Sequence, residues 1–98
     1  VLCPLLPSDP GHALWQRDFT GGCGLFSFVL KGGDDAARCR LIDRLALFGI
    51  GYSWGGFESL ALPFDVVPVR SAMPWPRVGW DKGDRFAVRL SIGLEDGG

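Results

Sequence analysis

The segment from Phe86 to Leu94 constrains the fold of this chain more than any other. Its residues alternate with a strict period of two, so that one face is apolar (Phe86, Val88, Leu90, Ile92, Leu94) and the other is small or polar (Ala87, Arg89, Ser91, Gly93). This alternation is typical of a β-strand with one buried face. A strand of this kind needs a second layer to cover its apolar side, so the pattern predicts a sheet covered by helices.

Two segments have the pattern of such helices. From Asp34 to about Phe48 the apolar residues recur at helical spacing and form one stripe: Ala37, Leu41, Leu45 and Phe48, with Ile42 beside them. The charged residues of this segment, Arg38 among them, are expected largely outside the stripe. A shorter helix is predicted from Pro10 to about Asp18, with Asp9 as its N-cap.

The other segments complete a small α+β domain. Residues 25–30 are apolar on nearly both faces, which indicates a central strand covered on both sides. Residues 2–6 are flanked and broken by prolines and predict an edge strand or an extended lead-in. Residues 49–59 form a glycine-rich loop, and residues 63–85, with four prolines, are expected to be an irregular connection. The fold prediction is α+β, a small sheet with helices packed on one face, in a single domain that spans the whole chain.

Composition excludes several classes of function. Ten basic and eleven acidic residues among 98 give a net charge of −1, which argues against nucleic acid or an anionic membrane as partner. The apolar stretches are interrupted by Gly, Ser or charged residues, so no transmembrane span or signal peptide is predicted. Three cysteines without a CxxC pair indicate a reduced, cytoplasmic setting. His12, the single histidine, has no ligand-spaced partner, and no metal site is predicted.

Arg89 is the most informative single residue. Its neighbours on the same strand face are small, so space is open above it, and its planar guanidinium could hold a carboxylate through two parallel hydrogen bonds. The alternative is an arginine that reaches solvent or pairs with an internal acid, and the strand pattern alone favours that alternative.

The glycine-rich loop is the second candidate. Its spacing is neither GxGxxG nor that of a P-loop. Trp54 and Phe57 could form the wall of a pocket there, or the loop could be a tight connection with buried aromatics. The two lysines, Lys31 and Lys82, both lie in Gly-flanked turns, whereas a Schiff-base lysine needs a buried setting.

Three ordered stretches carry a family resemblance: "LPSDPGHALWQRDFTGGCGLFSFVL", "LFGIGYSWGGFESLALP" and "VRLSIGLED". Together they resemble the C-terminal domain of the Cys/Met-metabolism pyridoxal-phosphate (PLP) enzymes, and within that family the cystathionine β-lyases. The resemblance implies an aminotransferase-like enzyme of fold type I, of which residues 1–98 form the small C-terminal domain. The cofactor lysine, the other cofactor-binding and catalytic residues and the last helix lie outside this chain. The fragment alone is therefore expected to be inactive.

The resemblance also implies a function for named residues. These enzymes are cytoplasmic homotetramers of methionine biosynthesis and transsulfuration, which cleave the C–S bond of a thioether amino acid by β-elimination, giving homocysteine, pyruvate and ammonia from cystathionine. The residue matching Arg89 binds the substrate α-carboxylate, and those matching Ser53 and Trp54 line the same pocket. A tyrosine at the position of Tyr52 resembles the β-cleaving lyase. The alternatives are cystathionine γ-synthase, cystathionine γ-lyase, a cysteine desulfhydrase, or a non-catalytic remnant module.

Overall fold

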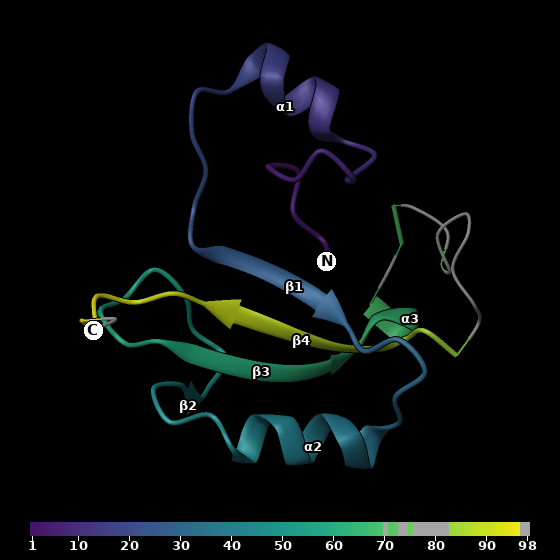
Figure 1. Ribbon diagram of the computed structural model, residues 1–98, viewed down its shortest axis with the longest axis vertical. Helices are drawn as coiled ribbons and strands as arrows, with labels where there is room; N and C mark the ends of the chain where they lie inside the picture. Colours follow the sequence, from purple (N-terminus) through teal and green to yellow (C-terminus); the bar gives the residue numbers. More distant parts are fainter. Residues whose placement is uncertain (70, 73–74, 76–82, 97–98) are drawn as a thin grey trace.

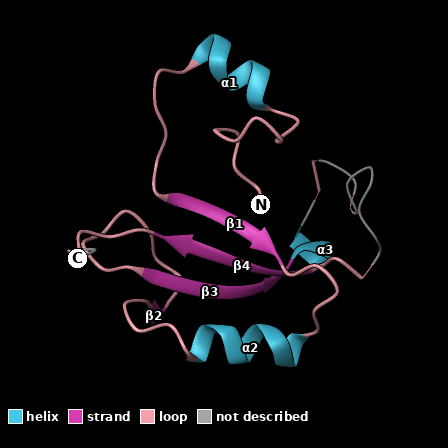
Figure 2. Ribbon diagram, in the orientation of Figure 1, coloured by secondary structure: helices cyan, strands magenta, loops and turns pink. Residues whose placement is uncertain are grey.

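The computed structural model describes residues 1–69, 71–72, 75 and 83–96. In this part of the chain four strands form one mixed sheet of order β1-β4-β3-β2: β1 (Leu25–Val29), β2 (Gly49–Ile50), β3 (Leu60–Asp65) and β4 (Phe86–Ser91). The helices are α1 (His12–Asp18), α2 (Asp35–Asp43) and α3 (Val66–Val69). Helix α2 lies along one face of β3 and β4 (Figures 1 and 2). The predicted α+β fold is confirmed.

Strand β4 is central, as its alternation suggests. It pairs antiparallel with β1 on one side and with β3 on the other. The strand ends at Ser91 instead of Leu94, although two further backbone hydrogen bonds continue the pairing in register. The Ile92 N–H donates to the Gly24 carbonyl, and the Leu94 N–H donates to the Phe57 carbonyl, each at 2.8 Å. Ile92 and Leu94 continue the apolar period in sequence but are exposed.

The core lies between α2 and the sheet. Ile42, Ala61 and Val88 are buried there, and the partly buried residues that pack on them are Phe28, Leu41, Leu45, Phe48 and Leu90. The predicted stripe is thus confirmed for Leu41, Ile42, Leu45 and Phe48, whereas Ala37 is not part of this core. Asp34 caps the helix by accepting from the Ala37 N–H at 2.8 Å. The helix itself ends at Asp43, because the last turn is tightened by bonds between residues three apart and the chain turns into β2.

Arg38 corrects the predicted polar face of α2. It was expected outside the stripe, but only 8% of it is exposed. Its position three and four residues before Leu41 and Ile42 places it on the sheet-facing side of the helix. One guanidinium nitrogen, Nη1, donates to the carbonyls of Phe64 at 2.6 Å and Ala87 at 3.2 Å. The prediction placed Arg38 outside the stripe because its partners are main-chain carbonyls, which leave no signal in the sequence.

Strand β1 corrects a second prediction. It was expected to be central, but it is an edge strand, and its five residues are all half-buried. Its outer side is partly occupied, since the Leu2 N–H donates to the Ser27 carbonyl at 2.7 Å in an isolated antiparallel bridge. The extended conformation predicted for residues 2–6 therefore holds at Leu2, whereas residues 4–6 form a turn in which the Leu6 N–H donates to the Cys3 carbonyl at 3.1 Å.

Strand β3 corrects a third prediction. Residues 63–85 were expected to be irregular, but they contain half of β3 and all of α3. Residues 70, 73–74 and 76–82 of this stretch lie outside the described residues. Pro63 is tolerated in this inner strand for a geometric reason. The Ala61 carbonyl accepts from Gly51 on the β2 side, and backbone groups alternate, so the Pro63 nitrogen faces the same side, beyond the end of the two-residue β2.

Helix α1 stands apart from the sheet and buries none of its residues (Figure 1). It begins at His12, two residues later than predicted, with Gly11 as N-cap. The Asp9 carboxylate instead stabilises the preceding turn, accepting from the N–H groups of Gly11 at 2.8 Å and Cys3 at 3.1 Å. Across the described residues, no helix has the length and apolar character needed to cross a membrane.

Candidate functional site

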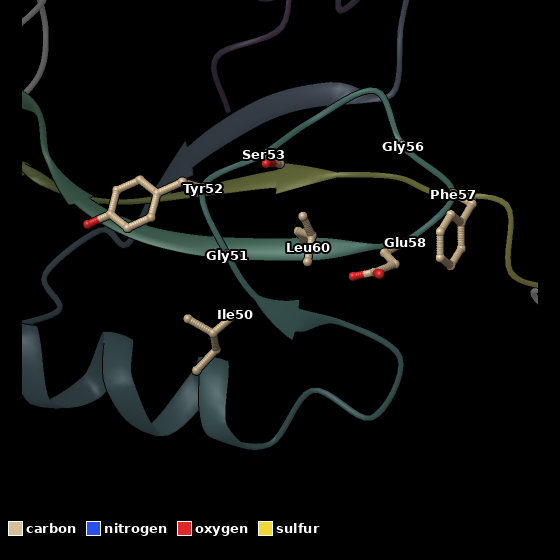
Figure 3. Close-up of a pocket in the computed structure, with 8 residues that line it drawn as sticks. All are labelled: Ile50, Gly51, Tyr52, Ser53, Gly56, Phe57, Glu58 and Leu60. Carbon is tan, nitrogen blue, oxygen red and sulfur yellow. The ribbon is translucent and has the colours of Figure 1, made fainter.

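The glycine-rich loop between β2 and β3, residues 51–58, is the centre of the candidate site. Figure 3 shows it leaving β2, passing across β3 and β4, and returning to β3. It borders an open cavity of about 370 Å³. The cavity is lined by Ile50, Gly51, Tyr52, Ser53, Gly56, Phe57, Glu58 and Leu60.

Arg89 lies on β4 between Ser27 of β1 and Leu62 of β3. Because Val88 and Leu90 face α2, Arg89 faces the opposite side of the sheet. Its Nη2 donates to the main-chain carbonyl of Tyr52. The guanidinium carbon is 5.1 Å from the centroid of the Trp54 ring, within the range of a cation–π contact.

The structure therefore brings three of the four predicted residues together, namely Arg89, Tyr52 and Trp54. The fourth, Ser53, lies between the other two loop residues and lines the cavity. Tyr52 contacts Arg89 through its carbonyl oxygen, a contribution that its residue type did not indicate.

The aromatic residues of the loop are exposed. Trp54 is 62% exposed, Phe57 70% and Tyr52 80%. The alternative of a tight connection with buried aromatics is therefore wrong. Exposed rings on a loop over a sheet are available to contact a ligand or another part of a larger protein.

The loop returns to β3 at a buried serine that is held by the segment after β4. The Ser59 N–H donates to Glu95 Oε1 at 2.7 Å, and the Ser59 hydroxyl donates to Glu95 Oε2. The hydroxyl also accepts from the Gly93 N–H at 2.9 Å. The two hydrogen bonds from Ser59 hold the pKa of the Glu95 carboxyl below its usual range, the hydroxyl having the larger effect. We call these contacts, together with that of Leu94 with Phe57, the loop clamp.

Sequence reasoning missed the loop clamp. Gly93 was considered only as a small neighbour of Arg89, but a Cβ there would lie 2.3 Å from the Phe57 carbonyl oxygen and 2.6 Å from the Ser59 nitrogen. The glycine is needed because two main chains approach closely. A glycine at the end of a strong strand pattern was the one local signal of this contact.

Lys31 does not fit the role of a cofactor-bearing residue. Lys31 is exposed in the turn after β1, and Lys82 lies outside the described residues. A Schiff-base lysine is activated by desolvation or by a neighbouring cation, and Lys31 has the opposite setting.

The fold and the loop define a class of protein. All 98 residues match the family described as Cys/Met metabolism PLP-dependent enzyme. The fold matches about a quarter of a solved transsulfuration enzyme, cystathionine gamma synthase from Xanthomonas oryzae pv. oryzae in complex with aminoacrylate and cysteine. The TM-score is 0.67 at 34% identity, covering 95% of this chain and 24% of that one. The chain belongs to the Cys/Met-metabolism PLP-dependent enzymes.

Within the family the chain is similar to cystathionine β-lyases. It is 48% identical over 92 residues to cystathionine beta-lyase of Bordetella avium, covering 94% of this chain and 22% of the relative. It is 42% identical over 94 residues to cystathionine beta-lyase MetC of Escherichia coli, covering 95% and 23%. The chain thus spans about a quarter of the length of these relatives.

Proposed function

We propose that this chain is the C-terminal part of a PLP-dependent carbon–sulfur lyase of the cystathionine β-lyase type, and that it binds the α-carboxylate of the substrate through Arg89. The observation that carries the proposal is the setting of the Arg89 guanidinium. One hydrogen bond to the Tyr52 carbonyl and the Trp54 ring fix its orientation. An arginine has five N–H donors in a planar fork, so donors remain for a carboxylate.

The substrate in this proposal is a thioether amino acid such as cystathionine, which the enzyme cleaves to homocysteine, pyruvate and ammonia. PLP supplies the electron sink for this chemistry, and its lysine belongs to a part of the enzyme outside this chain. The work of residues 1–98 is to neutralise and orient the carboxylate next to that part. From the family resemblance we further propose a cytoplasmic homotetramer, in which a last helix follows this domain.

Other members of the family are the second candidate: cystathionine γ-synthase, cystathionine γ-lyase or a cysteine desulfhydrase. The similarity of this chain to a solved γ-synthase supports these alternatives. The tyrosine at position 52 supports the β-lyase. Product analysis with cystathionine separates the β-lyase from the γ-lyase, because β-elimination gives homocysteine, pyruvate and ammonia while γ-elimination gives cysteine, 2-oxobutyrate and ammonia. A γ-synthase would instead form cystathionine, and a cysteine desulfhydrase would release sulfide from cysteine. A remnant module is tested by reading the coding sequence upstream for a lysine-bearing cofactor domain.

The kinetic test uses the parent enzyme, which is this chain joined to the upstream part of its own gene product. Where that upstream part lacks the cofactor lysine, the corresponding part of the E. coli β-lyase takes its place. Arg89→Lys keeps the charge but not the fork. It is expected to lower kcat/KM by about 1.5–3 kcal/mol, roughly 10- to 150-fold. Arg89→Ala is expected to lose more, because the carboxylate then has no charged partner.

Arg40→Ala is the matched control, since Arg40 is an exposed residue on α2. It is expected to leave kcat/KM unchanged. Wild-type kcat/KM in Arg89→Ala, with an unchanged circular dichroism spectrum, would overturn the proposed role.

A further inference from the structure

We propose that Glu95 is a positioning residue of the carboxylate site: through Ser59 it holds the loop of residues 51–58 where the Tyr52 carbonyl and the Trp54 ring contact Arg89. This inference rests on the proposed function and adds to it a residue 36 positions from the serine that it holds.

The first step is that Ser59 is fully occupied. Its N–H and its hydroxyl donate to the two oxygens of Glu95, and its hydroxyl oxygen accepts from the Gly93 N–H. Its carbonyl accepts from the Gly49 N–H at 2.9 Å. Ser59 is 6% exposed, so a polar group left without its partner here would be costly. The arrangement therefore allows one position for the end of the loop.

The second step is that the loop has little else to hold it. At its start, β2 comprises two residues that pair with β3. Between Gly51 and Ser59 every residue is exposed, and Gly55 has a φ of +81°. A chain segment of this kind gains conformational entropy as soon as one end is released. The loop clamp is thus the main restraint on the end that leads into β3.

The third step links the clamp to Arg89. The loop contacts the guanidinium through a main-chain carbonyl, that of Tyr52, so the contact depends on backbone position. A displaced loop removes this acceptor and moves the Trp54 ring. Arg89 then has to be ordered by the substrate itself, which weakens binding and misplaces the carboxylate.

The carboxylate of Glu95 is suited to this role at neutral pH. Its two hydrogen bonds from Ser59 keep its pKa low, so it stays ionised. Glu95 is also exposed, so its removal leaves no buried charge, and a variant is expected to remain folded.

The test measures KM and kcat of the parent enzyme carrying Glu95→Ala or Ser59→Ala. Both variants are expected to raise KM for cystathionine and lower kcat/KM about 10- to 100-fold, the size of effect that small misplacements of catalytic geometry produce. Glu95→Gln is expected to lie between these and wild type, because its amide oxygen still accepts from the Ser59 N–H. Asp43→Asn, which removes an exposed carboxylate on α2, is the control and is expected to match wild type.

A double-mutant cycle with Arg89→Lys separates positioning from simple loss of stability. If Glu95 acts through the loop on Arg89, Glu95→Ala costs much less in the Arg89→Lys background than in wild type. Additive effects, or a lowered melting temperature with wild-type KM, would overturn this inference. A different result would contradict the proposed function itself, namely wild-type kcat/KM in the single variant Arg89→Lys.

Discussion

The substitution Arg38→Met tests how the helical layer is joined to the sheet. Methionine keeps a long apolar side chain in place but removes every donor of the guanidinium. In the wild-type protein Nη1 links α2 to the carbonyls of Phe64 and Ala87. The other nitrogens donate to Asp35, and the guanidinium carbon is 5.3 Å from the centroid of the Phe86 ring.

The expected magnitude follows from these contacts. Hydrogen bonds that involve a charged group contribute about 1.5–3 kcal/mol each, so the two carbonyl contacts give about 3–6 kcal/mol. The pair with Asp35, whose side chain is 62% exposed, adds at most about 1 kcal/mol. Removing a buried guanidinium also removes its desolvation cost, which offsets part of the loss. We expect a net loss of about 2–4 kcal/mol.

Hydrogen exchange with mass spectrometry on the parent enzyme measures this loss in peptides that span β3 and β4. Arg40→Met, an exposed change on the same helix, is the control and is expected to stay within about 0.5 kcal/mol of wild type. An opening free energy of β3 and β4 that is the same in both variants would refute the reasoning. It would mean that the carbonyl contacts of Arg38 contribute nothing beyond its apolar stem.

Four further outcomes are expected. Leu45→Ala should lower the opening free energy of α2 by about 2 kcal/mol, the low end for leucine, because Leu45 is only partly buried; unchanged exchange there would place it outside the core. Gly93→Ala should cost about 1–3 kcal/mol through its clash with the loop backbone, whereas Gly21→Ala, with nothing within 4 Å, should be neutral by the same exchange measurement. The pKa of the Glu95 carboxyl is lower in the folded than in the unfolded protein. Its ionised form therefore stabilises the fold above the unfolded pKa of about 4.3, and this stability is lost as the pH falls through the lower folded pKa. A ¹³C NMR titration that gives the Glu95 carboxyl a pKa of about 4.3 or above would contradict this. The isolated chain should show no lyase activity and no Schiff-base absorbance with PLP; a band that disappears on changing either lysine would show otherwise.

The parts of the fold that could be predicted are those encoded by local periodicity. The alternation around Arg89 gave a strand, and the stripe of α2 gave the helix that covers it. Strand order is different, because it depends on pairing between distant segments. Residues 25–30 have the apolar content of a central strand, yet β4 pairs on one side of β1 and, within the described part of the chain, Leu2 alone bonds on the other. Strand β3 was not predicted because it contains Pro63. The proline is acceptable there because β2 is short and does not reach it, and the sequence around Pro63 does not show this.

The candidate site also contains residues that could be predicted from the sequence and residues that could not. Small neighbours drew attention to Arg89, and the family resemblance added Tyr52, Ser53 and Trp54. The loop clamp could not be predicted, because Ser59 and Glu95 are polar residues without a motif and are brought together by the fold. The Tyr52 carbonyl was equally hidden, since any residue type carries the same main-chain oxygen.

A comparison of Arg38 on α2 with Arg89 on β4 separates a structural arginine from the proposed binding arginine. Both donate to main-chain carbonyls and both lie near an aromatic ring, at 5.3 Å from Phe86 and 5.1 Å from Trp54. For Arg38 all three guanidinium nitrogens are engaged by the helix and the sheet, under cover of α2. For Arg89 the contact within the described residues uses Nη2 alone, on the face opposite α2 and beside an exposed ring. A guanidinium that its own fold orients but does not saturate has donors left for a carboxylate, which is the role that we propose for Arg89. On that proposal, loss of Arg38 lowers stability while loss of Arg89 lowers kcat/KM.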